Sequence, residues 1–171
     1  MHNKGKIVER LLTYLDSSSS SSKLVQCGVV DLFVALVKDF RADIYEEFMA
    51  AILPKVVGSL DITNVELMDK VFTLVSFAVK YLTKSIKEDL PRFYGVYSEL
   101  LCHRNKFVRK FSAQALCYVV RKVAFDDKMI SLILSTLEGQ QAKDLECAVT
   151  GISELLFEVA YGAGDGLHSK A

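Results

Sequence analysis

Several features that whole classes of protein require are scarce in this sequence of 171 residues. It has only 2 prolines and 9 glycines, which excludes collagen-like chains and architectures dominated by loops. Its 4 cysteines lie far apart without a Cys-x-x-Cys pair, so their spacing indicates neither a disulfide framework nor a zinc site. An excess of either charge is also missing, because 21 basic residues balance 21 acidic ones. This balance argues against a protein that binds polyanions over its whole surface, although a local basic patch is compatible with it.

Long apolar runs and targeting segments are missing as well. No stretch reaches the roughly 18 consecutive apolar residues of a membrane span, and the best run, Val71–Val79, contains Thr73 and Ser76. The first residues, Met1–Lys6, are not followed by the apolar segment of a signal peptide. We therefore expect an intracellular, reduced protein with no membrane contact.

Apolar residues with a helical period dominate the chain. Hydrophobic residues make up 51% of it and charged residues 25%, which is sufficient for a buried core and excludes a disordered chain. Apolar side chains recur every three or four residues in successive segments, without the sustained alternation that is typical of strands. The pattern predicts an all-α protein. Its eight expected helices span residues 7–15, 23–40, 43–57, 64–85, 87–101, 105–123, 126–137 and 142–161.

Local signals predict how several helices begin or bend. The last of six consecutive serines, Ser17–Ser22, can cap the helix that follows, since a serine hydroxyl accepts a hydrogen bond from a free backbone N–H. Asp126 and Asp127 are placed to cap the helix that they precede. Pro54 should kink its helix, because proline cannot donate the internal hydrogen bond.

The polar and glycine-rich segments divide the chain into parts. We interpret the serine run as a flexible linker, with phosphorylation as the alternative. Gly162–Gly166 predicts a helix stop followed by disordered residues. The expected parts are a short helix and Ser-rich linker over 1–22, helical repeats over 23–161, and a disordered tail over 162–171.

Similar helical segments recur at a regular distance. The helix beginning at Asn64 overlays the one beginning at Asn105 after about 40 residues, and a spacing of two helices per unit of about 40–47 residues is typical of HEAT or armadillo repeats. Val108–Leu116 is similar to the second helix of a HEAT repeat, whose arginine, here Arg109, often pairs with an acidic residue in the preceding turn. That turn, His103–Asn105, has no acidic residue. We predict a HEAT/armadillo-like α-solenoid of three to four helix pairs, with Arg109 as its structural arginine.

No residues are predicted to carry out catalysis. Cys102 and His103 are neighbours in the chain and diverge on a helix, so they do not form a nucleophile–base pair. The glycines at 162–166 follow a helix, whereas a phosphate-binding loop precedes one. We expect no catalytic residue, no metal ion and no cofactor.

Positive charge is concentrated in the middle of the chain. Residues 79–123 form a basic block with 10 basic and 3 acidic residues, a net charge of +7. The net charge is −2 for residues 1–78 and −5 for residues 124–171. A basic ridge on a solenoid can follow a phosphate backbone, and the alternative is an ordinary solvated helix face.

Six of these basic residues are candidates for binding. Lys80, Lys84 and Lys87 are spaced four and three residues apart, so they can share one helical face. Arg104, Lys106 and Lys110 flank the turn before the next expected helix and can extend the surface formed by the three lysines. The aromatic residues between them have the helical spacing of core residues. The candidate RNA- or partner-binding residues are Lys80, Lys84, Lys87, Arg104, Lys106 and Lys110.

Three runs carry a resemblance to a known family: residues 60–64, 71–82 and 107–115. They resemble the N-terminal region of the very large HEAT-repeat proteins of the small-subunit processome, which associate with a small nucleolar RNA particle. The resemblance implies a non-catalytic nucleolar scaffold, in the nucleus, that acts in pre-rRNA processing and small-subunit assembly. Its implied partners are pre-ribosomal RNA, proteins of the small nucleolar RNA particle and neighbouring repeats of a longer solenoid. Because family members are many times longer, it also implies a fragment, a split gene product or a short relative.

A second hypothesis is a generic HEAT-repeat adaptor that binds a protein partner in its concave face. The salt dependence of binding distinguishes the two hypotheses. RNA binding through the basic block should weaken steeply with salt, whereas binding of a protein in an apolar groove should not. The last expected helix is apolar up to the glycine-rich stretch, as in a solenoid without a polar capping repeat.

Overall fold

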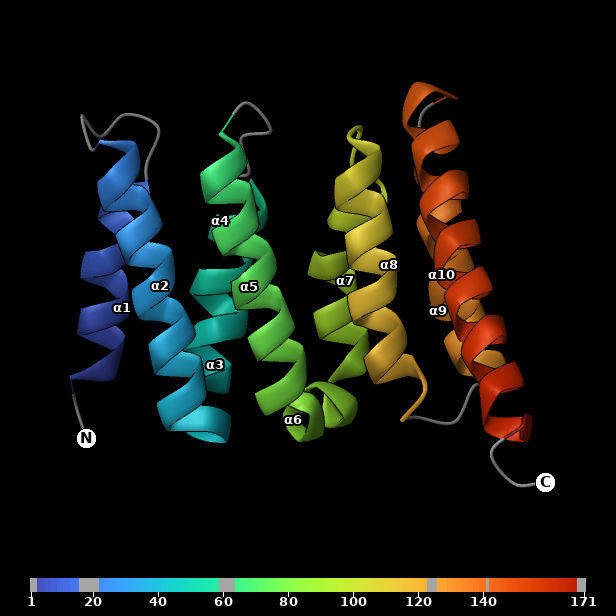
Figure 1. Ribbon diagram of the computed structural model, residues 1–171, viewed down its shortest axis with the longest axis horizontal. Helices are drawn as coiled ribbons and strands as arrows, with labels where there is room; N and C mark the ends of the chain where they lie inside the picture. Colours follow the sequence, from blue (N-terminus) through green and yellow to red (C-terminus); the bar gives the residue numbers. More distant parts are fainter. Residues whose placement is uncertain (1–2, 16–21, 59–63, 123–125, 141, 169–171) are drawn as a thin grey trace. The chain divides into compact units, whose positions relative to one another are not determined.

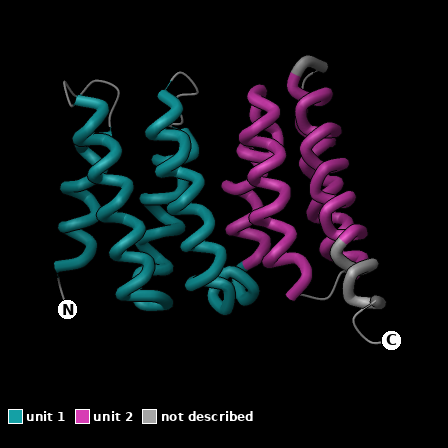
Figure 2. Tube along the Cα trace, viewed as in Figure 1, with its two compact units in different colours: residues 1–89 teal, residues 90–171 magenta. Residues whose placement is uncertain are grey.

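The computed structural model describes residues 3–15, 22–58, 64–122, 126–140 and 142–168, with the side chains of 142–143 and 162–168 left out. These residues form helices and turns and contain no strand, which confirms the all-α prediction. None of the helices among them is long and apolar enough to cross a membrane. The chain divides into two compact units, residues 1–89 and 90–171 (Figure 2).

The first unit is built around the contact between two long helices, α2 (Lys23–Phe40) and α5 (Val65–Tyr81). A second layer lies behind them, in which α1 (Lys4–Leu12) contacts η3 (Phe48–Ile52) (Figure 1). The predicted apolar stripes form the core between the layers. The remaining elements are η1 (Thr13–Leu15), η2 (Arg41–Ile44), α3 (Tyr45–Glu47), α4 (Leu53–Gly58) and α6 (Thr83–Glu88).

The helix predicted over 43–57 is a series of short segments. Its middle is a π-helical turn in which the N–H of Leu53 donates to the carbonyl of Phe48, five residues back. This turn lies immediately before Pro54, where the sequence predicted a kink. Because proline has no N–H and its ring crowds the carbonyl four residues back, a wider turn relieves the clash.

The single helix predicted over 64–85 is wrong, because α5 ends at Tyr81 and α6 begins at Thr83. Between them, Leu82 has φ −99° and ψ 8°, outside the helical region. The hydroxyl of Thr83 donates to the carbonyls of Val79 and Lys80. Thr73 makes the same kind of bond to the carbonyl of Asp69 inside α5, which continues past it, so this bond alone does not explain the break.

The second unit consists of two layers, with α7 (Leu90–Leu101) and α9 (Asp127–Glu138) behind α8 (Lys106–Val120) and α10 (Ala142–His168) (Figure 1). Its closest packing is between α8 and α10, and α7 contacts α8. The backbone of α10 continues past Gly162, so the tail predicted over 162–171 is helical as far as His168. Glycine lowers helix stability without forbidding the conformation.

The predicted starts of α2 and α9 (Asp127–Glu138) agree with the structure, whereas the helix expected from residue 87 begins at Leu90 as α7. Ser22 Oγ accepts from the N–H of Val25 at 3.4 Å, and Asp126 Oδ1 accepts from the N–H of Met129 at 3.0 Å. Both predicted caps are thereby confirmed. The predicted linker residues 17–21 lie outside the described part of the chain.

Candidate nucleic-acid interface

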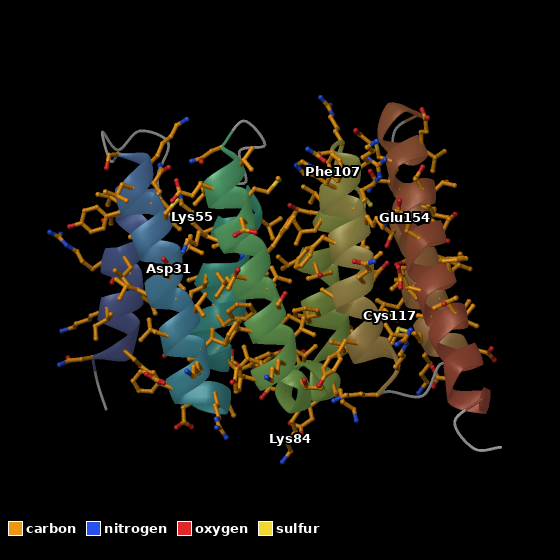
Figure 3. All side chains as sticks on the ribbon, in the orientation of Figure 1. Asp31, Lys55, Lys84, Phe107, Cys117 and Glu154 are labelled. Carbon is orange, nitrogen blue, oxygen red and sulfur yellow. The ribbon has the colours of Figure 1, made fainter. Side chains whose placement is uncertain are left out.

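The candidate basic residues lie in both units. Lys80 is on α5 and Lys84 and Lys87 are on α6, all three exposed, and Figure 3 shows Lys84 directed away from the helices. The break at Leu82 separates Lys80 from the other two. The argument from a shared helical face therefore applies only to Lys84 and Lys87.

The other three candidates surround the start of α8 in the second unit. Arg104 lies in the turn before it, and Lys106 and Lys110 lie in its first turns, all exposed. Arg104 lies 3.9 Å from Asp144, an exposed ion pair of little energetic weight. No ion pair of Lys106 or Lys110 is found among the described residues. Their charges are therefore available to an anionic partner.

Arg109 holds the turn that carries these residues. Its Nη1 donates to the carbonyl oxygens of His103 at 2.7 Å and Arg104 at 2.9 Å. The hydrogen-bond partners of this Nη1 are therefore backbone carbonyls of the preceding turn, which contains no acidic residue. The Nε of Arg109 is buried, with no hydrogen-bond partner in the described part of the chain.

His103 and Asn105 complete the turn. The Nδ1 of His103 accepts from the N–H of Asn105 at 3.1 Å, and Asn105 Oδ1 accepts from the N–H of Phe107 at 2.8 Å. Accepting this bond requires an unprotonated Nδ1. Burial, with a further contribution from Arg109 and Arg104, lowers the pKa of His103.

We expect His103 to make stability fall as the solution becomes mildly acidic. Because the folded-state pKa is below the unfolded value of about 6.5, stability is fully present above that value and is lost as pH falls through the folded pKa. Urea unfolding at pH 7.5, 6.5 and 5.5 measures this loss, and His103→Gln should show a shallower dependence. An identical pH dependence in the variant would show that His103 does not contribute.

Phe107 departs from the expectation that aromatic residues of the basic block lie in the core. Phe93, Tyr94 and Tyr97 are buried, as the spacing predicted. Phe107 is 62% exposed in the first turn of α8, and the Nζ of Lys106 lies 5.3 Å from its ring centroid (Figure 3). The buried stripe of α8 begins one residue later, at Val108. Its position just after an Asn cap is the sequence signal that could have identified it.

Three of the four thiols, those of Cys27, Cys102 and Cys117, are poorly suited to act as nucleophiles. Burial, with contributions from Cys147, Asp144 and Glu99, raises the pKa of Cys102 to about 11. Burial likewise raises the pKa of Cys27 and of Cys117. A nucleophilic cysteine needs a lowered pKa. Among the described residues no group of three or more His, Cys, Asp or Glu side chains could hold a metal ion.

A groove of about 610 Å³ lies between the start of α7 and the first turns of α9. Apolar residues such as Leu90, Met129 and Leu132 line it, together with the acidic Asp126 and Asp127. Asp126 is occupied as the cap of α9. Lys128, Ser131 and Ser135 line the same groove.

Fold and surface together define an all-α protein of packed helix pairs with exposed cations at helix ends. No protein-family model matches the chain. It is similar to U3 small nucleolar RNA-associated protein 20 of Saccharomyces cerevisiae, at 24% identity over 175 residues. The match covers 99% of this chain and 7% of the yeast protein, so the chain spans a small part of that relative's length.

Proposed function

We propose that the protein is a non-catalytic scaffold of the small-subunit processome, acting in pre-rRNA processing and small-subunit assembly in the nucleolus. The observation that carries this proposal is the similarity to a small nucleolar RNA-associated protein, which extends over 99% of the chain. The exposed cations of the basic block give each unit positive charge that can bind RNA phosphates. Its partners would be pre-ribosomal RNA and proteins of the small nucleolar RNA particle.

A HEAT-like solenoid of three to four helix pairs is part of the same proposal. It is supported by the two-layered packing of consecutive helices within each unit and by the roughly 40-residue spacing in the sequence. Exposed apolar residues on the outer face of α10 are a further argument for a neighbouring repeat in a longer solenoid. Val149 and Leu156 are exposed there, and Phe157 and Tyr161 are 66% and 62% exposed. Large apolar side chains exposed together on one helix mark a surface that another element normally covers.

A tagged pull-down of this chain from nucleolar extract at low and high salt tests the scaffold. We expect enrichment of precursor ribosomal RNA that falls as salt rises, because binding through phosphates releases counterions. Absence of ribosomal RNA from the low-salt eluate would contradict the proposal. The α10 face favours the second candidate, a generic adaptor, which would instead recover proteins without ribosomal RNA at either salt concentration.

Reversing Lys84, Lys87, Lys106 and Lys110 together to glutamate should abolish RNA association without unfolding the chain. All four side chains are exposed, so their replacement removes phosphate contacts and leaves the core intact. RNA recovery in the same pull-down and the far-UV circular dichroism spectrum measure the two effects.

The matched control reverses four exposed lysines outside the basic block. Lys6, Lys23, Lys38 and Lys128 are suitable, and reversing them changes the net charge by the same amount. The control should bind RNA more strongly than the first variant. Equal loss in both would mean that net charge, and not this surface, governs binding.

A further inference from the structure

The start of α8 combines an exposed aromatic ring with several cations inside one unit. Lys110 lies three residues after Phe107, so the two are neighbours on the helix surface. The Nζ of Lys106 lies over the Phe107 ring, 5.3 Å from its centroid, and Arg104 directly precedes the cap residue Asn105. Because the Phe107 side chain is 62% exposed, it contributes little apolar burial to the fold.

The backbone next to Phe107 is held by hydrogen bonds on both sides of the cap residue Asn105. Arg109 binds the two carbonyls that precede Asn105, while the cap bond from Asn105 fixes the N–H of Phe107. His103 holds the N–H of Asn105. A preorganised surface of this kind loses little conformational freedom when a ligand binds.

The chemistry of these groups selects one kind of ligand. An aromatic face stacks on an unpaired base, and lysine and arginine side chains bind the phosphates on either side of it. The N-terminal end of α8 adds a favourable dipole for anions. Duplex RNA offers phosphates with bases already stacked, and an acidic peptide offers carboxylates without a flat partner for the ring.

We propose that Phe107, together with Arg104, Lys106 and Lys110, forms a binding site for single-stranded RNA in which one base stacks on the Phe107 ring. This inference rests on the proposed RNA association and specifies which form of RNA the second unit binds. Tyr118 and Lys122 form a similar pair, with Nζ 4.0 Å from the ring centroid. They lie at the opposite end of α8, where the dipole disfavours phosphates.

Binding of a fluorescent single-stranded uridine decamer to the full chain, followed by anisotropy at low salt, tests the site. Phe107→Ala should weaken binding by about 5- to 100-fold, the range that loss of one base–aromatic stack causes. Phe107→Tyr should retain most of the affinity, since a tyrosine ring stacks equally well. Because the ring carries no charge, Phe107→Ala should leave the salt dependence unchanged, whereas Lys106→Gln with Lys110→Gln should reduce it.

Phe157→Ala is the matched control, since Phe157 is 66% exposed in the acidic C-terminal segment. This variant should bind the decamer like the unmodified chain, and an RNA duplex should compete poorly. Wild-type affinity in Phe107→Ala, combined with loss in the lysine variant, would overturn the stacking site and leave RNA association intact. Equal losses in Phe107→Ala and Phe157→Ala would also overturn it. Absence of decamer binding by the unmodified chain would overturn the site, while the pull-down decides separately on association with ribosomal RNA.

Discussion

Replacing Gly151 with alanine should destabilise the second unit by about 3 kcal/mol or more, the upper end of the cost of overpacking. Gly151 is buried on α10 and faces Leu101, the last residue of α7. A Cβ at this position would lie 1.8 Å from the carbonyl oxygen of Leu101 and 2.8 Å from its carbonyl carbon. These atoms belong to the backbone, so rotation of a side chain cannot make room. The two helices would have to separate.

Chemical denaturation followed by circular dichroism measures this loss. Gly95→Ala is the matched control, because Gly95 is an exposed helical glycine of α7 with no atom within 4 Å of the point where an added Cβ would lie. It should stabilise the protein by about 0.5–1 kcal/mol, since alanine favours the helix more than glycine does. A Gly151→Ala variant as stable as Gly95→Ala would mean that α10 and α7 do not approach each other this closely.

Truncating Tyr97 to alanine should cost about 3–5 kcal/mol, as for other large aromatic core residues. Tyr97 is fully buried in α7, stacked on Phe93 with ring centroids 5.0 Å apart. Its hydroxyl donates to the carbonyl of Ser112 on α8 at 3.0 Å. Tyr97→Phe keeps the ring and should cost only about 1 kcal/mol, the net value of one hydrogen bond. Denaturation of the two variants separates packing from hydrogen bonding, and equal losses would contradict this division.

The same residue should make the protein sensitive to alkali. Burial raises the pKa of Tyr97 well above its ordinary value. A group whose folded-state pKa is raised contributes stability that is present below the unfolded pKa, about 10 for tyrosine, and lost as pH rises beyond it. Stability should therefore fall above about pH 10, and Tyr97→Phe should fall less steeply over the same interval.

Much of the helical structure could be predicted because its signals are local. The starts of α2 and α9 depend on one side chain, Ser22 or Asp126, bonding an N–H three residues later. The apolar residues of α8 recur with the period of a helix, and this pattern can be recognised without knowing which segments cover them. One prediction failed at the junction of α5 and α6. The apolar pattern continues through it, yet the backbone of Leu82 leaves the helical region and α5 ends at Tyr81.

The candidate site was harder to predict for a related reason. The sequence identified the basic block and six candidate cations within it, because charge is a property of residue type. It did not distinguish Phe107 from the buried aromatics, since exposure depends on which helix faces the ring. It also found no partner for Arg109, because backbone carbonyls are present in every turn and only the folded turn directs two of them at one guanidinium.

The sequence by itself therefore determined the all-α class, the helix caps and the position of the basic block, which all follow from contacts within a few residues of the chain. The tertiary structure alone decided that Gly151 must lack a side chain, that Arg109 binds carbonyls and that Phe107 faces solvent. The requirement at Gly151 is set by how closely two distant helices approach each other, whereas Arg109 reaches carbonyls five and six residues before it once the turn has folded. Hydrophobic packing determines that approach, and it depends on the shapes of both surfaces together.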